Sequence, residues 1–368
     1  MEVFMSIAIR PFVKKDLTRF VSAISPLLSP SAVNFALITD THDKAKFATT
    51  YYGPTGYWHV REQQWLSGQL PLALRVHLGD LVDGSEAPWL TRLRLRNIMA
   101  DYQSGPVPFL VTKGNHDDND KFAEKRAGHR GSFLPEVNQT LIFKPNAEQT
   151  GVAVSQEGLM VQDFPNLRII VLNTADVPLI DGHKAFDVKK TLAVSFAQLR
   201  NFALALKGAG KRDVLLLSHA PALKENGQPA LKFNGRAVHE LLRAFNFHAS
   251  GVLHTDEAPA FGGRLRFDFR QSSGRVVGYL AGHYHLEADY IVNGIHYSLQ
   301  NTSALMGRHH GLTTKFNRRY DRRFGLPSEY AGYVVSVDTQ QRLLSLYGYG
   351  AASRVRRFQY SSRMVRFF

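Results

Sequence analysis

The feature of this sequence that most constrains its fold is a repeated order of short apolar run, polar turn and, in several cases, helical stretch. The runs are four to seven residues long and rich in branched side chains, which is typical of buried strands. They are Val33–Thr39, Leu74–Leu78, Val107–Thr112, Leu167–Leu172, Val214–Leu217 and Val276–Ala281. Helical patterns separate several of them, at His59–Gln69, Ala87–Gln103, Ala193–Lys207 and Asn234–Phe247. This alternation predicts an α/β fold.

Two hairpins are predicted after these units. The first turns at Asn293-Gly294, a dipeptide that favours tight hairpin turns, between the apolar segments Tyr290–Val292 and Ile295–Tyr297. The second joins Tyr333–Val337 to Leu343–Tyr347 and is expected to complete a sheet.

The polar motifs that follow the strands are spread from Asp40 to His285, so one domain has to gather them. We expect a helical extension over residues 1–30, with an amphipathic helix at 16–28, a single domain over 31–350 and a basic tail over 351–368. Three stretches lack clear periodicity, near 118–165, 224–275 and 301–330. Such long loops are usually lids, substrate-binding inserts or disordered segments.

Five polar motifs come directly after strand-like runs. They are Asp40-Thr41-His42, Gly79-Asp80-Leu81-Val82-Asp83, Gly114-Asn115-His116-Asp117, Ser218-His219 and Gly282-His283-Tyr284-His285. Because ligands of open α/β sheets gather beyond the carboxyl ends of the strands, these motifs are expected to converge. Asn173-Thr174, which ends the fourth run, is interpreted as structural.

The sequence has no cysteine, so a metal would be held by nitrogen and oxygen ligands. The motifs offer carboxylates, an amide and imidazoles, enough for two divalent ions that share one carboxylate. Two metals about 3.5–4 Å apart can bind a bridging hydroxide and polarise a phosphoryl oxygen, which suits phosphoester hydrolysis. Manganese, iron, zinc, nickel and cobalt all fit such ligands.

As an ordered set, the five motifs resemble the signature of the calcineurin-like metallophosphoesterase superfamily, from about Val33 to His285. The resemblance implies a four-layer αββα sandwich of mixed β-sheets with flanking helices. It also implies that Asp80 bridges two metals, that His116 acts as general acid, and that Asp83 is a carboxylate that orients His116. The implied ligands are Asp40, His42 and His285 for the first metal and Asn115, His219 and His283 for the second.

Details of the motifs favour one branch of that superfamily. Asp83 is followed by Gly84-Ser85-Glu86, whereas serine/threonine phosphatases have Asp-Arg-Gly there, and sugar-lipid pyrophosphatases carry arginine in place of His116. The remaining branch includes bacterial phosphodiesterases of the cyclic-nucleotide type and DNA-repair nucleases. We therefore expect a phosphodiesterase acting on a nucleotide or another small phosphodiester. A nuclease or a phosphomonoesterase is the alternative, and a non-catalytic scaffold is least favoured because no ligand is missing.

The net charge of +14 is concentrated at the end of the sequence, where residues 301–368 hold twelve basic and three acidic residues. Aromatic residues lie among these arginines, at Phe316, Tyr320, Phe324, Phe358 and Tyr360. The region could bind a polyanion such as nucleic acid, or simply be a solvated basic surface. Residues 1–30 have no apolar run long enough for a membrane span or secretory signal, so a cytoplasmic location without membrane attachment is expected. The oligomeric state stays open.

Overall fold

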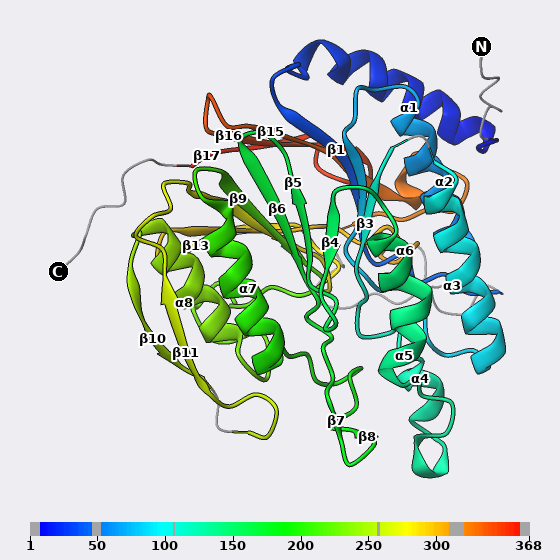
Figure 1. Ribbon diagram of the computed structural model, residues 1–368. Helices are drawn as coiled ribbons and strands as arrows, with labels where there is room; N and C mark the ends of the chain where they lie inside the picture. Colours follow the sequence, from blue (N-terminus) through cyan, green and yellow to red (C-terminus); the bar gives the residue numbers. More distant parts are fainter. Residues whose placement is uncertain (1–7, 46–52, 106, 256–257, 309–319, 361–368) are drawn as a thin grey trace.

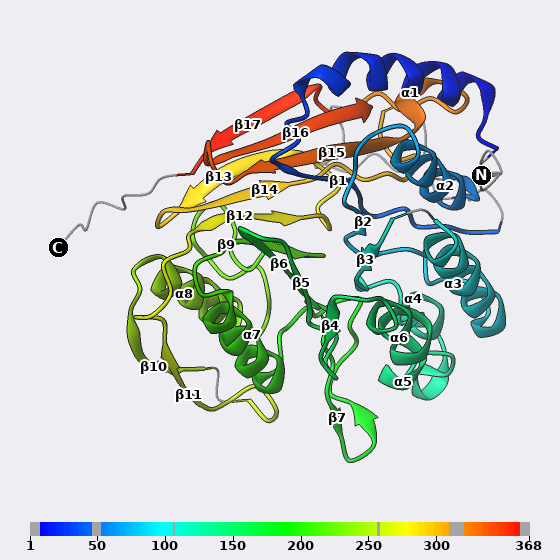
Figure 2. The ribbon, with the colours of Figure 1, turned by 45° about the horizontal axis from the view of Figure 1, so that its top comes forward.

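Two β-sheets face each other and carry helices on their outer faces, which gives four layers (Figure 1). This computed structural model describes residues 8–45, 53–105, 107–255, 258–308 and 320–360. The layers are also separate in the rotated view of Figure 2. The four-layer αββα sandwich with mixed sheets is therefore confirmed.

The first sheet has the strand order β17-β16-β15-β1-β2-β3. Its strands are β1 (Val33–Ile38), β2 (Leu74–His77), β3 (Phe109–Val111), β15 (Ala331–Asp338), β16 (Leu343–Gly350) and β17 (Val355–Gln359). The strands β1, β2 and β3 are parallel, and the C-terminal strands join them antiparallel. The predicted hairpin at β15 and β16 thus extends the sheet that begins with β1.

The second sheet has the order β13-β14-β12-β9-β6-β5-β4. Its strands are β4 (Val152–Val154), β5 (Met160–Asp163), β6 (Leu167–Leu172), β9 (Asp213–Ser218), β12 (Val276–Ala281), β13 (Ala288–Val292) and β14 (Ile295–Leu299). Parallel pairing joins β6, β9, β12 and β14, while β13 and β14 form the predicted hairpin. The carboxyl ends of its parallel strands lie at one edge.

Five long helices cover the outer faces. They are α1 (Pro11–Ile24), α2 (Thr55–Ser67) and α3 (Pro88–Gln103) on the first sheet, and α7 (Phe196–Ala209) and α8 (Gly235–Asn246) on the second. α1 begins earlier than the periodicity predicted, because Pro11 suits a first helical position, and it ends in a 3₁₀ turn, η1 (Ser25–Leu27). α7 begins after Ser195, whose side chain accepts a hydrogen bond from the Gln198 amide.

The core follows the alternation of side chains along the strands. In β1, Phe35 and Leu37 face the second sheet, whereas Ala36 and Ile38 face the helices. In β6, Ile169 and Val171 face the first sheet, whereas Ile170 and Leu172 pack on the side of α7. Burial on both faces explains why these strands read as continuous apolar runs.

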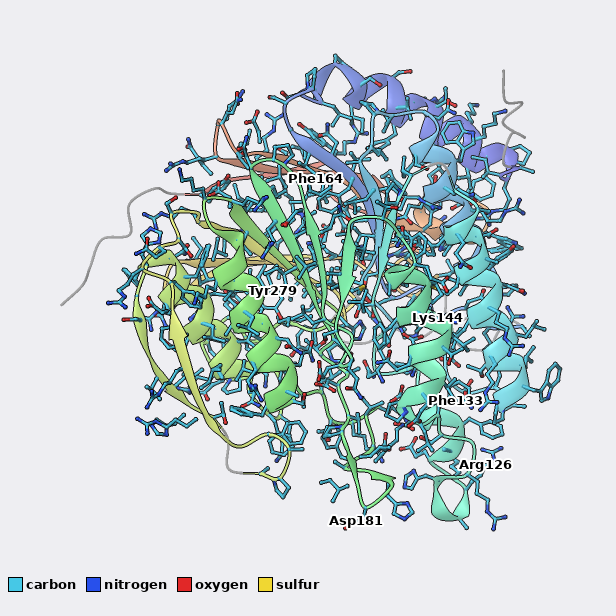
Figure 3. The ribbon with its side chains drawn as sticks, in the orientation of Figure 1. Arg126, Phe133, Lys144, Phe164, Asp181 and Tyr279 are labelled. Atoms are coloured by element: carbon cyan, nitrogen blue, oxygen red, sulfur yellow. The ribbon has the colours of Figure 1, made fainter. Side chains whose placement is uncertain are left out.

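All three aperiodic stretches contain helices or strands. Residues 118–165 hold α4 (Asp120–Ala123), η2 (Ala127–His129), α5 (Pro135–Asn138), the π-helical η3 (Gln139–Phe143), α6 (Lys144–Ala147), β4 and β5. A small hairpin of β7 (Leu179–Ile180) and β8 (His183–Lys184) projects beside α4, with Asp181 at its tip in Figure 3. Residues 224–275 hold α8 and a two-stranded sheet of β10 (Ser250–His254) and β11 (Arg264–Asp268). In 301–330 the structure has η4 (Pro327–Glu329), and residues 309–319 lie outside its described part.

The separate tail expected from residue 351 is not what the structure shows. β17 pairs with β16 from Val355 to Gln359, and the Tyr360 hydroxyl donates a 2.7 Å hydrogen bond to Asp213 of the other sheet. The first sheet therefore continues to residue 359, and residues 361–368 lie outside the described part. Among the described helices, none is long and apolar enough to cross a membrane.

Candidate metal centre

The five sequence motifs meet at one edge of the sandwich. Asp40 and His42 follow β1, Asp80 follows β2, and Asn115 and His116 follow β3, while the remaining histidines follow β9 and β12. Their side chains form three overlapping groups with ligand atoms within 4.8 Å of one another: Asp40, His42, Asp80 and His285; Asp80, His219 and His283; His42, Asp83 and His116. The predicted convergence is therefore observed, since Asn115 also contacts His219.

The first group surrounds a small space with nitrogen and oxygen atoms. The two Nε2 atoms of His42 and His285 are 3.1 Å apart, and His285 Nε2 is 3.1 Å from Asp40 Oδ1. His42 Nε2 lies 3.6 Å from Asp80 Oδ2. These atoms come from three different strand ends, so the arrangement depends on the whole fold.

The second group is built in the same way and shares one atom with the first. His219 Nε2 lies 2.9 Å from Asn115 Oδ1, 3.2 Å from His283 Nδ1 and 3.4 Å from Asp80 Oδ2. Asp80 Oδ2 is thus between His42 and His219. A single carboxylate oxygen reaches both groups.

These donor sets fit divalent metals. Ligands about 2.1 Å from one metal and at right angles to each other are about 3 Å apart, which is close to the spacing seen here. The neighbouring bonds also direct the right atoms to the centre: His219 Nδ1 donates to the Leu78 carbonyl, which leaves Nε2 for a ligand position. Asp40 Oδ2 accepts from the Thr39 hydroxyl and the His283 amide, which leaves Oδ1 for a ligand position.

The backbone at the strand ends is unusual. Five of the candidate ligands have left-handed φ angles: 53° at Asp40, 45° at His42, 53° at Asp80, 69° at His283 and 56° at His285. Residues other than glycine rarely adopt this conformation, and such strain collects at functional sites. These turns direct the ligand side chains of each motif toward the candidate metal centre.

Two glycines allow the turns to pack this closely. A Cβ at Gly114 would clash with the Asp80 backbone and carboxylate, and one at Gly282 would clash with Thr39 and the Asp40 carboxylate. Both motifs therefore require glycine, because the neighbouring turn comes too close to leave room for a side chain.

Burial and charge set the protonation of the centre. Burial would raise the pKa of the Asp40 and Asp80 carboxyls, but the neighbouring imidazoles hold both below their usual values. Burial lowers the pKa of His283 to about 3. Burial would also lower the pKa of His219, but the Asp80 and Asp40 carboxylates raise it to about 9. Because anionic carboxylates and neutral imidazoles are the forms that bind metal, His219 would have to release a proton on metal binding. His116, His283 and His285 are half-buried, so the centre opens to solvent on their side.

His116 is oriented, but by a different atom than the resemblance implied. Its Nδ1 lies 2.9 Å from the backbone carbonyl of Asp83, to which it can donate, and its amide donates to Asp80 Oδ1. The Asp83 carboxylate instead accepts from Lys44, at 3.1 Å, from Lys121 and from the Ser85 hydroxyl. Burial alone would raise the pKa of Asp83, but Lys121 and the Ser85 hydroxyl stabilise its ionised form, and the pKa is lowered.

Sequence reasoning missed the residues that support the ligand-bearing turns through hydrogen bonds and contacts. The Thr302 hydroxyl donates to the Asp40 carbonyl at 2.7 Å, and Met306 Sδ lies 3.0 Å from His285 Nδ1. Both belong to a segment that we call the strap, residues 301–306, which follows β14 and has no periodic pattern. Asp117 is buried and accepts from the amides of Gly114 and Val82.

Asn173-Thr174 is structural, as interpreted. The Asn173 side chain donates to the Glu157 carbonyl, and the Thr174 hydroxyl accepts from the Ala220 amide. The second of these bonds fixes the turn after His219.

Comparisons with known proteins agree with this geometry. The model of the calcineurin-like phosphoesterase family matches residues 33–287. A dimetal phosphatase from Danio rerio aligns with a TM-score of 0.58 and 14% identity, over 89% of this chain and 99% of that chain. A purple acid phosphatase from yellow lupin seeds aligns with a TM-score of 0.51 and 12% identity, over 89% of this chain and 54% of that chain. At this identity the likeness concerns the fold. A search of curated proteins found no match.

Proposed function

The chain belongs to the calcineurin-like phosphoesterase family, a family of metal-dependent phosphoric ester hydrolases, and we propose that it is a phosphodiesterase acting on a nucleotide or another small phosphodiester. The observation that carries the proposal is the place of Asp80 Oδ2, which lies 3.6 Å from His42 Nε2 and 3.4 Å from His219 Nε2. One oxygen shared by two ligand groups is what a dinuclear centre needs.

We assign Asp40, His42 and His285 to one metal, Asn115, His219 and His283 to the other, and Asp80 to both. Two bound divalent ions supply Lewis acidity that polarises a phosphoryl oxygen and lowers the pKa of water. The chain itself fixes its ligands through the bonds of Thr39, Thr302 and Leu78 described above.

His116 is assigned as the general acid. With Nδ1 donating to the Asp83 carbonyl, a proton on Nε2 is present when the ring is an imidazolium. Donation of that Nε2 proton to the leaving oxygen avoids release of an unstabilised alkoxide. The half-buried ring lies 4.8 Å, centroid to centroid, from His42, beside the candidate metal centre.

A diester is favoured over a monoester by the charges around His116. Asp83 is followed by Gly84, where an arginine would grip a dianionic phosphate, and Lys44 and Lys121 form ion pairs with Asp83. A singly charged diester needs less cationic contact than a dianionic monoester.

Nucleic acid is less favoured as the substrate, because part of the basic C-terminal region serves the fold. Arg322 is buried and donates to Thr302 and Asn301, and Arg356 donates to the Leu299 carbonyl. Phe358 packs on His296 and Tyr360 is buried. These groups are therefore engaged within the protein.

The proposal is tested by assaying bis(p-nitrophenyl) phosphate, cyclic nucleotides, p-nitrophenyl phosphate and single-stranded DNA with Mn²⁺ at several salt concentrations. We expect the small diesters to have the highest kcat/KM. A preference for p-nitrophenyl phosphate would indicate a phosphomonoesterase, and DNA cleavage with steep salt dependence would indicate a nuclease.

The role of His116 is tested by His116→Ala. We expect the variant to retain its metals and to lose about 10²–10⁴-fold in kcat, with the smallest loss for p-nitrophenolate as leaving group. Equal losses for good and poor leaving groups would contradict proton donation by His116.

A further inference from the structure

A cavity of about 510 Å³ lies between two inserts at the site edge of the sandwich. One wall is the loop 128–134 after α4, and the other is the end of the β7–β8 hairpin with residues 186–187. The hairpin and α4 lie side by side in Figures 1 and 2, and Figure 3 shows Asp181 at the hairpin tip and Phe133 on the facing insert. The volume is within the range of small-molecule sites.

One residue connects this cavity to the candidate metal centre. The Lys189 carbonyl accepts a 3.3 Å hydrogen bond from the side-chain amide of Asn115. The Lys189 amide donates to Asp187 Oδ1, at 2.9 Å, and Asp187 lines the cavity. Lys189 thus lies between Asp187 in the cavity lining and Asn115 of the second metal group.

The two walls are held together by buried charge pairs. Lys184 of the hairpin lies 3.1 Å from Asp118 and 2.9 Å from Asp120 of the other insert, and the Val188 amide donates to Asp120. Burial would lower the pKa of Lys184, but the two carboxylates raise it, so the lysine stays charged and paired. The cavity is thus a built part of the fold.

The lining combines an aromatic ring with basic groups. Phe186 stacks on Phe261 with ring centroids 5.8 Å apart, and Phe261 in turn stacks on Phe233 at 4.4 Å, so the ring that lines the cavity is held by two others. At the other side His129 and Arg130 are exposed. A fixed aromatic face binds a nucleobase by stacking, and a guanidinium donates hydrogen bonds to the acceptor atoms of a base or sugar.

We propose that this cavity binds the nucleoside part of a nucleotide diester, with the base packed on Phe186, Arg130 beside it, and the phosphate directed toward Asn115 of the second metal group. The inference rests on the proposed phosphodiesterase function and specifies its substrate class. A volume of about 510 Å³ fits a mononucleotide better than a continuous nucleic-acid strand.

The first test compares two diesters that release the same leaving group, thymidine 5′-(p-nitrophenyl phosphate) and methyl p-nitrophenyl phosphate. The measured quantity is kcat/KM for the nucleoside ester divided by kcat/KM for the methyl ester. In Phe186→Leu this ratio should fall about 10-fold, since base stacking is lost. Arg130→Gln should lower the same ratio.

Matched controls separate binding from stability. Phe245→Leu removes a buried ring that packs on Phe269, away from the cavity lining, and Arg126→Gln removes a nearby cation that packs on Phe122. Both controls should keep the wild-type ratio. An unchanged ratio in Phe186→Leu, or an equal fall in Phe245→Leu, would overturn the inference.

A second measurement does not depend on turnover. Binding of thymidine 5′-monophosphate to the purified protein, measured by equilibrium dialysis, should weaken about 10-fold in Phe186→Leu and stay unchanged in Phe245→Leu. If the wild type binds this probe but hydrolyses neither diester, the proposed function fails and the cavity assignment stands. If it hydrolyses diesters but does not bind the probe up to millimolar concentration, the cavity assignment fails.

Discussion

At the scale of single residues, the two oxygens of Asp80 serve different partners. Oδ1 accepts a 2.8 Å hydrogen bond from the His116 amide, while Oδ2 faces both His42 and His219. The first bond fixes the carboxylate plane and at the same time places the candidate acid. Ligand geometry and proton donation are therefore coupled through one side chain.

Asp80→Asn tests this sharing. The amide keeps the shape but lacks the negative charge, so we expect both metals to bind more weakly and activity to fall together with metal content. Elemental analysis and kcat measured on the same preparations check the result. Full metal content at full activity would contradict the bridging assignment.

Asp83→Asn is the matched control. It removes a neighbouring buried charge but keeps the backbone carbonyl that accepts from His116. Both metals should be retained, and kcat should fall less than in His116→Ala.

The sequence brought the candidate ligands together but said little about what supports them. Asp40, Asp80 and His219 could be found because each follows a recognisable apolar run. The resemblance gave the orienting role to the Asp83 carboxylate, whereas the bond to His116 comes from the Asp83 carbonyl, because a motif does not say which atom of a residue acts. The left-handed φ angles are equally invisible, since they arise from close contacts between separate turns.

At the scale of elements, the strap at residues 301–306 connects the end of β14 to the turn after β1. Besides the Thr302 hydroxyl, the Ala304 amide donates to the Asp40 carbonyl at 3.0 Å, and the buried Arg322 donates to the Thr302 carbonyl. A segment without regular structure thus holds the first metal group in place. Its aperiodic sequence gave no sign of this role, because its contacts are made by single residues far apart in the chain.

Thr302→Val removes the hydroxyl but keeps the branched shape. We expect affinity for the first metal, at Asp40, His42 and His285, to fall about 10–100-fold, as for other residues that orient metal ligands. The second metal should bind as in the wild type. Isothermal titration calorimetry with Mn²⁺ measures both affinities, and it resolves the two metal sites when their affinities differ.

Thr255→Val provides the comparison, because it removes a similar hydroxyl-to-carbonyl bond in the β10–β11 hairpin. It should leave both affinities unchanged. A loss at both sites in Thr302→Val, or at neither, would rule out a local role for the strap.

At the scale of the whole molecule, the alternation of strands and helices predicted the parallel centre of each sheet but not its edges. β15 pairs with β1 across almost the entire chain length, and β17 adds a further strand where a tail was expected. Such pairings depend on which apolar faces remain uncovered after the centre has formed. Periodicity within a single segment does not contain that information.

The sandwich also buries basic groups, and this affects its response to acid. His77 ends β2 and is fully buried: its Nδ1 accepts from the Gly79 amide, and its Nε2 lies 3.0 Å from the Thr41 hydroxyl. Burial lowers the pKa of His77 to about 3. Because the unfolded chain binds a proton near pH 6.5 and the folded chain does not, the stability that neutral His77 contributes is present above pH 6.5 and is lost as the pH falls.

His77→Gln isolates this effect. At pH 7.5 the variant should be less stable than the wild type, and the difference should shrink by about 2 kcal/mol by pH 5.0, since each pH unit below 6.5 costs the wild type about 1.4 kcal/mol. Urea unfolding at several pH values, with EDTA present so that proton-linked metal binding does not contribute, measures it. His254→Gln, at an exposed position in β10, should follow the wild-type curve. A constant difference between wild type and His77→Gln across this range would mean that the pKa of His77 is the same in the folded and unfolded chain, which would contradict a buried Nδ1 held as the acceptor of the Gly79 amide.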